Sequence, residues 1–133
     1  MDAAAIADLF IAFGPVKVRR MFGGAGIYAD GVMFALDADD TLYLKTDAAF
    51  AAELEAEGAA PFSYEASNGR RTIMSYWQVP NAALDQPDEL AAYARRAFHI
   101  ALAAAEETAR KKAGKPAGKK ASAKAGRKPP QTP

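Results

Sequence analysis

The chain alternates between segments whose apolar residues recur at helical spacing and segments in which they follow the period of a strand. Apolar residues three or four positions apart predict helices over residues 3–13, 47–57 and 88–112. An aspartate stands at the start of each segment, where its carboxylate can accept a hydrogen bond from a free backbone N–H: Asp2, Asp47 and Asp88. The buried stripe of the last helix is rich in alanine, which indicates a close approach to a sheet.

The clearest strand pattern lies around Asp30-Gly31, between the apolar residues 27–29 and 32–36. Both residues of a type I′ turn need positive φ, so this pair predicts a β-hairpin with a two-residue loop. The loop sets the expected register: Ala29 opposite Val32, Tyr28 opposite Met33, and Ile27 opposite Phe34. This register places three residues on the core face: Ile27, Phe34 and Leu36. Residues 41–45 form the next strand.

Residues 61–66 and 70–79 repeat the strand–turn–strand pattern around Asn68-Gly69, which again favours a type I′ hairpin. Residues 16–22 alternate less clearly, and we interpret them as an extended link or a short edge strand. Hairpins join most of the strands. The expected fold is therefore α+β, with two layers, a five-stranded, mainly antiparallel sheet and the order α-β-β-β-α-β-β-α.

The composition of the 133-residue chain changes sharply after Lys112. Residues 113–133 consist almost entirely of Ala, Gly, Lys, Pro and Ser and contain no aromatic residue. Such a segment cannot bury enough apolar surface to offset the entropy of ordering its backbone. The sequence therefore predicts one folded domain, residues 1–112, followed by a disordered tail, residues 113–133.

Charge is distributed unevenly along the chain, although the net charge is only +1. Residues 110–133 contain nine basic residues and no acidic one: Arg110, Lys111, Lys112, Lys115, Lys119, Lys120, Lys124, Arg127 and Lys128. Residues 1–109 hold the other eight basic residues and all 16 acidic residues, a net charge of −8. Lysines on a flexible chain neutralise phosphates without reading bases, so these nine residues are candidates for non-specific DNA binding. The alternative is a tail that only solubilises the protein.

Composition and spacing disfavour several kinds of reactive site. The chain has no cysteine and a single histidine, His99, which excludes disulfides, cysteine nucleophiles and metal sites built from several His or Cys ligands of one chain. The glycine run 23–26 precedes a strand, whereas a phosphate-binding loop opens a helix, so we expect a bulge or a close backbone contact there. Asp37, Asp39 and Asp40 lack the spacing of a calcium loop and are expected to form a solvated turn.

These observations lead us to predict no catalytic, cofactor or metal site, with His99 a partly exposed helical residue. No segment has the ~18 consecutive apolar residues of a membrane helix. The N-terminus also lacks the cationic start of a signal peptide. We therefore expect a soluble, cytoplasmic protein without membrane contact.

A candidate binding surface lies on the predicted sheet. An open sheet in a two-layer fold leaves one face uncovered, and Tyr28, Met33 and Tyr43 are expected to point to that face. An exposed apolar patch of this kind is typical of a protein-binding surface. The alternative is that these side chains pack only against one another across the strands.

Four sequence blocks resemble the N-terminal domain of the TfoX/Sxy family: RMFGGAGIYADGVMFAL at 20–36, LYLK at 42–45, PFSY at 61–64 and MSYWQVP at 74–80. The resemblance implies a two-layer fold with the order α-β₃-α-β₂-α, which agrees with the order that the pattern predicts. It also implies a regulator without catalytic residues, because better-known members regulate bacterial competence genes together with a cyclic-AMP receptor protein. Ala25 stands where the family pattern has an aromatic residue, and the basic tail stands where longer regulators carry a second helical domain.

Two functional hypotheses follow. The first is a non-enzymatic regulatory module whose folded domain binds a protein partner, such as a transcription factor, while its tail holds it near DNA. The second is a small-ligand-binding domain or an enzyme that uses a pocket between the sheet and the helices. The absence of cysteine and of a cofactor fingerprint disfavours the second hypothesis.

Overall fold

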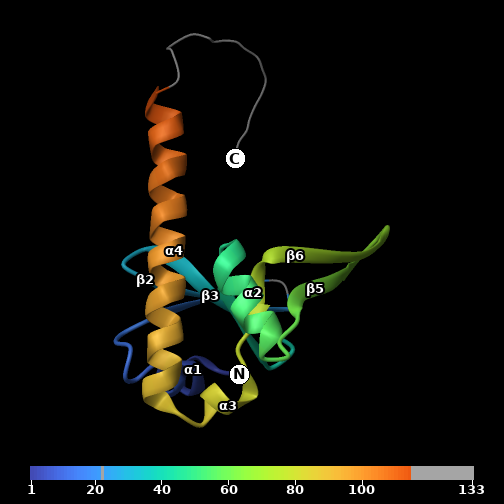
Figure 1. The fold of residues 1–133 in the computed structure, drawn as a ribbon, viewed down its shortest axis with the longest axis vertical. Coiled ribbons are helices and arrows are strands. Elements are labelled where there is room, and N and C mark those ends of the chain that lie inside the picture. Colours follow the sequence, from blue (N-terminus) through green and yellow to red (C-terminus); the bar gives the residue numbers. More distant parts are fainter. Residues whose placement is uncertain (22, 115–133) are drawn as a thin grey trace. The chain divides into compact units, whose positions relative to one another are not determined.

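The computed structural model describes residues 1–21 and 23–114, which form a six-stranded sheet and four helices (Figure 1). All neighbouring strands are antiparallel, and their order across the sheet is β1-β2-β3-β4-β6-β5. The elements are α1 (Ala3–Leu9), β1 (Lys17–Met21), β2 (Gly24–Ala29), β3 (Val32–Ala38), β4 (Thr41–Lys45), α2 (Ala48–Ala56), β5 (Pro61–Ala66), β6 (Gly69–Gln78), α3 (Asn81–Leu84) and α4 (Pro87–Gly114). The α+β class is confirmed, but the predicted order α-β-β-β-α-β-β-α is wrong in two places, because the sheet has six strands rather than five and the short helix α3 precedes α4.

The additional strand is β1, in the segment for which the pattern predicts an extended link or a short edge strand. It pairs with β2 so that Val18 lies opposite Ile27 and Arg19 opposite Gly26. Val18 packs against the core, whereas Arg19 is exposed. A five-residue edge strand in which Val18 alone is partly buried carries a short alternating signal, which explains why the sequence did not distinguish it from a link.

The first predicted hairpin is present with its type I′ turn, since Asp30 and Gly31 have φ of 49° and 78°. Tyr28 pairs with Met33 as expected, but Ile27 pairs with Ala35 rather than Phe34, because the register shifts between Ile27 and Tyr28. Phe34 is therefore an extra residue of β3, a β-bulge, and both Phe34 and Ala35 are fully buried in the core. One result is that Leu36, predicted to share the core face with Ile27 and Phe34, pairs with Gly26 and Tyr43 on the opposite face.

The second hairpin has a different turn from the one predicted. Gly69 pairs with Ala66 and has a φ of 118°, so that Ser67 and Asn68 form the loop. Asn68 is not among the described residues with positive φ. A turn followed by a glycine that starts the next strand is a common alternative to type I′, and the Asn-Gly pair by itself does not separate the two.

Helix ends follow the predicted caps in two of three cases. Asp2 and Asp47 each accept a 2.8 Å hydrogen bond from the backbone N–H three residues further on. Asp88 does not cap α4, because this helix begins at Pro87, whose missing N–H costs nothing in the first turn. The helix α1 ends at Leu9, earlier than the predicted residue 13, although the residues that follow still reach the core.

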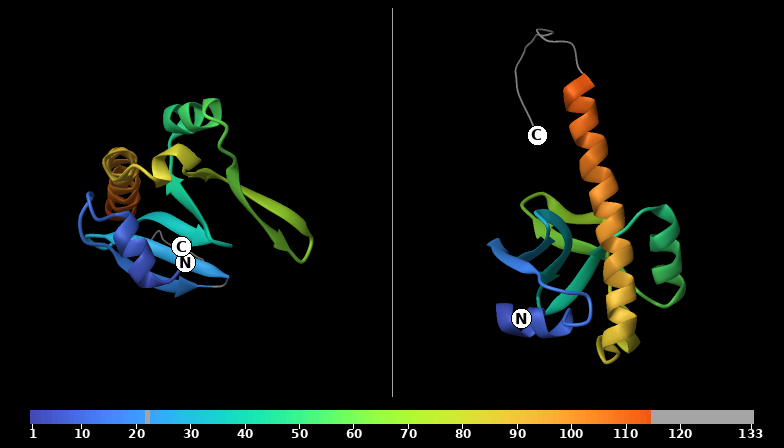
Figure 2. Two further views of the ribbon diagram at one scale, coloured as in Figure 1. Left: turned by 90° about the horizontal axis from the view of Figure 1, so that it is seen from below. Right: turned by 90° about the vertical axis from the view of Figure 1, so that its left-hand side faces the viewer.

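Residues from the sheet and from all four helices share one core. The ring of Phe34 lies 5.5 Å from that of Phe10, 5.0 Å from Phe13 and 6.3 Å from Phe98, so β3 joins the N-terminal segment to α4. The helices α2 and α4 lie on the same side of the sheet (Figure 2). Arg96 of α4 donates two 2.7 Å hydrogen bonds to the Glu53 carboxylate of α2.

The helix α4 (Pro87–Gly114) extends beyond the predicted helix, residues 88–112, at both ends. The chain divides into one unit over Met1–Ala103 and a second that begins at Ala104, and α4 continues from the first into the second. The predicted domain end at residue 112 falls within this helix. The predicted disordered tail lies outside the described residues, except for residues 113 and 114, which end α4.

Candidate functional site: the open face of the sheet

The strand register assigns each sheet residue to one of two faces. Ile27, Ala35, Leu44 and Trp77 lie side by side on neighbouring strands and are all buried in the helix-packed core. Successive residues of a strand point to opposite faces, so their neighbours form the other face, which we call the open face. Its residues are Lys17, Arg19, Met21, Gly24, Gly26, Tyr28, Met33, Leu36, Ala38, Thr41, Tyr43, Lys45, Tyr76 and Gln78.

Two thioethers and a phenol ring converge above a glycine on the open face. A Cβ at Gly26 would lie 3.0 Å from Met21 Cε, 3.0 Å from Tyr28 Cε1 and 3.1 Å from Met33 Sδ. A side chain at this position would therefore displace all three ends. Met21 is 46 % exposed, and Tyr28 and Met33 are partly exposed. The structure thus brings two of the three predicted patch residues together, and Met21, which was not among the predicted residues, lies beside them.

The third predicted patch residue, Tyr43, heads a row of aromatic rings. The Tyr43 ring meets the Phe62 ring edge-on at 5.0 Å, and Phe62 stacks on Tyr64 at 5.8 Å. Tyr64 is 44 % exposed. This row continues the open face onto the β5–β6 hairpin, where Arg71 lies opposite Tyr64.

Basic side chains lie against the rings of this face. The Arg19 guanidinium is 5.8 Å from the Tyr28 ring centroid, and the Lys45 ammonium is 5.3 Å from that of Tyr76. Both distances are within the range of a cation–π interaction. These cations were not among the residues predicted from the sequence, although strand alternation places Lys45, two residues from Tyr43, on the same face.

Tyr76 is the most enclosed phenol of the open face. Burial, with a smaller contribution from Tyr28, raises the pKa of Tyr76 to about 12. Burial also raises the pKa of Tyr43, and the Asp39 carboxylate adds to this shift. Both phenols therefore remain neutral at physiological pH, and the cations supply the charge of the open face.

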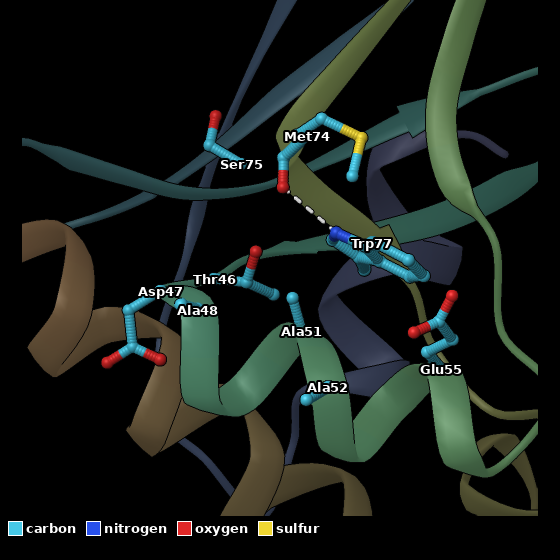
Figure 3. A pocket seen from close by; sticks show the side chains of 9 residues that line it. All are labelled: Thr46, Asp47, Ala48, Ala51, Ala52, Glu55, Met74, Ser75 and Trp77. Carbon is cyan, nitrogen blue, oxygen red and sulfur yellow. Dashed lines mark hydrogen bonds between the residues drawn. The ribbon is translucent and has the colours of Figure 1, made fainter.

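A separate pocket of about 520 Å³ lies between α2 and β6 on the helix-covered side (Figure 3). Ala51, Met74 and Trp77 form much of its wall, and the Trp77 indole donates a 2.9 Å hydrogen bond to the Met74 carbonyl. The Thr46 hydroxyl beside it is buried and has no hydrogen-bond partner among the described residues. The Asp47 carboxylate at its edge already accepts the capping hydrogen bond of α2.

The structure places the other candidate residues of the sequence apart from the open face. His99 is exposed on α4, with its ring 5.8 Å from that of Phe98. Asp37 does not belong to a solvated turn as predicted, because it is a buried residue of β3, and its carboxylate lies 3.2 Å from the Met1 ammonium. Only Asp39 and Asp40 form the turn, with φ of 50° and 58°.

The glycine run makes the close backbone contact that the sequence predicts. A Cβ at Gly24 would collide with the backbone carbonyl of Asp37. No metal site is evident in residues 1–21 and 23–114, which contain no group of three or more His, Asp or Glu side chains placed to hold an ion. Among the described helices, none combines the length and apolarity that a membrane span requires.

Three of the nine predicted DNA-binding residues can be placed. Arg110, Lys111 and Lys112 are exposed near the end of α4. The other six lie outside the described residues: Lys115, Lys119, Lys120, Lys124, Arg127 and Lys128.

Comparison with protein families adds to this geometry. The family model of the TfoX N-terminal domain matches residues 8–101, which include the whole sheet and most of its helix layer. The chain belongs to the TfoX N-terminal domain family. TfoX N-terminal domains are in general regulatory modules linked to competence, without enzymatic activity. No curated protein matches this TfoX-family chain.

Proposed function

We propose that this TfoX-family domain is a non-enzymatic regulatory module that binds a protein partner through the open face of its sheet. The observation that carries the proposal is the convergence of Met21, Tyr28 and Met33 above Gly26, on the face away from the helix-packed core. Methionine is flexible and polarisable and is frequent at protein-binding surfaces. Aromatic residues at the centre of such a surface supply much of the binding energy.

In this proposal the basic residues from Arg110 onward hold the complex near DNA. Residues 1–109 carry a net charge of −8 and are repelled by the phosphate backbone, so the attraction has to come from the nine basic residues that follow. Such contacts do not read bases. The selection of a promoter would therefore belong to the partner, which we propose to be a transcription factor in the cytoplasm.

The test is the capture of partners by the full-length chain from nuclease-treated extract of the native cell. Met33→Ser removes a thioether from the open face, and Met74→Ser is a matched control, since Met74 is 62 % exposed and lines the pocket of Figure 3 instead. We expect Met33→Ser to lose the captured partner and Met74→Ser to retain it. Retention by both variants would contradict the proposal.

The second candidate function is the binding of a small, mainly apolar ligand in the pocket between α2 and β6. The observation that favours it is the buried Thr46 hydroxyl, which lacks a partner among the described residues and lies beside about 520 Å³ of space. This function predicts the reverse result, with Met74→Ser the damaging change and Met33→Ser neutral.

A further inference from the structure

Positive charge is concentrated on the open face of an otherwise acidic domain. Residues 1–109 contain twice as many acidic as basic residues. Half of those eight basic residues nevertheless lie on the open face or its continuation beside Tyr64: Lys17, Arg19, Lys45 and Arg71. No described strand residue of this face is acidic, and none of the four cations forms an ion pair with another described residue.

Two of these cations are held by the sheet itself. Arg19 lies over the Tyr28 ring and Lys45 over the Tyr76 ring, at 5.8 Å and 5.3 Å from the ring centroids. Each interaction restricts a long side chain before any partner arrives, which lowers the entropy cost of binding. It also covers a ring face that a nucleobase would need for stacking. The arrangement therefore favours carboxylates over stacked bases as the groups that meet these cations.

We infer that the partner binds the open face with an acidic segment that also carries apolar side chains. Its carboxylates meet Arg19, Lys45 and Arg71, and an apolar side chain covers Met21 and Met33. This inference rests on the proposed function and specifies the chemistry of the same surface. Charge excludes the chain's own residues 110–133 as the occupant, because they contain nine basic residues and no acidic one.

The test uses the full-length protein with carbon-13 labels on its methionine methyl groups. The probe is a synthetic peptide of about 20 residues in which Glu alternates with Leu and Phe, long enough to cross a surface of this kind. A second peptide has Gln in place of every Glu, and a thymidine oligonucleotide of equal length represents nucleic acid. We expect the acidic peptide to shift the methyl signals of Met21 and Met33 and to leave that of Met74 unchanged.

The affinity of charge variants for the acidic peptide is then measured by fluorescence anisotropy at low salt. R19Q/K45Q/R71Q is expected to weaken binding of the acidic peptide by about tenfold or more. The matched control R20Q/R95Q/R96Q removes the same total charge from residues outside the open face and is expected to change it by less than about twofold. Circular dichroism and thermal melting verify that both variants are folded.

Several results would overturn the inference. The inference is wrong if the protein binds the Glu and Gln peptides with equal affinity. It is also wrong if neither peptide shifts the signals of Met21 and Met33, or if the two triple variants weaken binding equally. If the oligonucleotide but not the acidic peptide shifts the methyl signals of Met21 and Met33, the face binds nucleic acid. If these signals move only when the protein concentration is raised, the face binds a second copy of the chain. If Met33→Ser loses the cellular partner while R19Q/K45Q/R71Q retains it, the proposed function stands and the acidic partner does not.

Discussion

The guanidinium carbon of Arg19 lies 5.8 Å from the centroid of the Tyr28 ring, on the face of the sheet opposite the helix-packed core. This relationship depends on β1, the edge strand that the sequence only partly revealed. β1 contributes Lys17, Arg19 and Met21 to the open face, so two of its four cations and part of its apolar centre come from one five-residue strand. The same pairing with β2 brings Met21 above Gly26.

The two glycines of β2 are expected to respond differently to alanine. A Cβ at Gly24 collides with the rigid backbone of Asp37, whereas the atoms nearest to a Cβ at Gly26 belong to the movable side chains of Met21, Tyr28 and Met33. We expect Gly24→Ala to lower the free energy of unfolding by about 3 kcal/mol or more and Gly26→Ala by about 1 kcal/mol. Urea unfolding measures both. Equal losses would show that the contact between β2 and Asp37 is wrongly described.

Gly26→Ala also separates folding from binding. The variant is expected to fold, but its methyl group displaces the Met21, Tyr28 and Met33 ends from their common position. Partner capture should therefore fall although the variant remains folded at the temperature of the capture. Full capture by a folded Gly26→Ala protein would mean that these three side chains do not form the contact surface.

Phe34 is expected to be the most costly ring to remove. It is fully buried and touches the rings of Phe10, Phe13 and Phe98. Phe34→Ala should destabilise the domain by about 3–5 kcal/mol, because it removes apolar contacts and leaves a cavity between layers. Tyr64→Ala is the control at a ring that is 44 % exposed, with an expected loss below about 1 kcal/mol. Chemical denaturation compares the two, and similar losses would refute the placement of Phe34.

Alkaline titration tests the enclosure of Tyr76. Its pKa is raised from 10.0 to about 12 in the folded domain, chiefly by burial. Above pH 10 the unfolded chain therefore binds fewer protons at this residue than the folded one, and stability falls between pH 10 and about 12. Tyr76→Phe should remove one late-titrating phenol from the ultraviolet absorbance titration and flatten that decline.

Tyr93 provides the comparison for this titration. Burial, together with the 2.7 Å hydrogen bond that its hydroxyl donates to Glu57, also raises the pKa of Tyr93 to about 12. Tyr93→Phe should remove a second late phenol, and the double variant should remove both. If Tyr76→Phe left the late phase unchanged, Tyr76 would be an ordinary solvated phenol and the open face would be less enclosed than described.

DNA binding by the basic residues from Arg110 onward is predicted to be weak and indifferent to sequence. If roughly five of the nine contact phosphates, the slope of log K against log salt concentration should be near −4 to −5, with affinities of about 10⁻⁴ to 10⁻⁶ M at physiological salt. K111Q/K112Q/K119Q/K120Q should flatten the slope on any duplex, and K17Q/R19Q should matter less. Titration of a labelled duplex at several salt concentrations measures this. A strong preference for one sequence would contradict it.

The sequence predicts most of this fold because its strongest signals are local. Turn residues with positive φ identify the hairpin at Asp30-Gly31, and aspartate caps identify the starts of two helices. The register beyond the turn was not predictable in the same way. The shift beside Ile27 accompanies the packing of Phe34 against Phe10 and Phe13, a tertiary arrangement that leaves no pattern in β2 itself.

The candidate site was predictable in part for the same reason. Tyr28 and Met33 face each other across a two-residue turn, so a local rule places them together. The neighbourhood of Tyr76 and Lys45 depends on the pairing of β4 with β6, strands separated in sequence by α2 and β5. Nothing in the spacing of residues along the chain indicates that pairing, and the concentration of charge on the open face becomes visible only once it is known.

Site-specific photocrosslinking in living cells tests most directly whether the open face binds the protein partner. A photoreactive phenylalanine analogue replaces Tyr64 on the open-face side and, in a second strain, exposed His99 on α4. We expect a discrete protein adduct from position 64 that survives nuclease treatment and no such adduct from position 99. An adduct from position 99 but none from position 64 would show that the partner binds elsewhere.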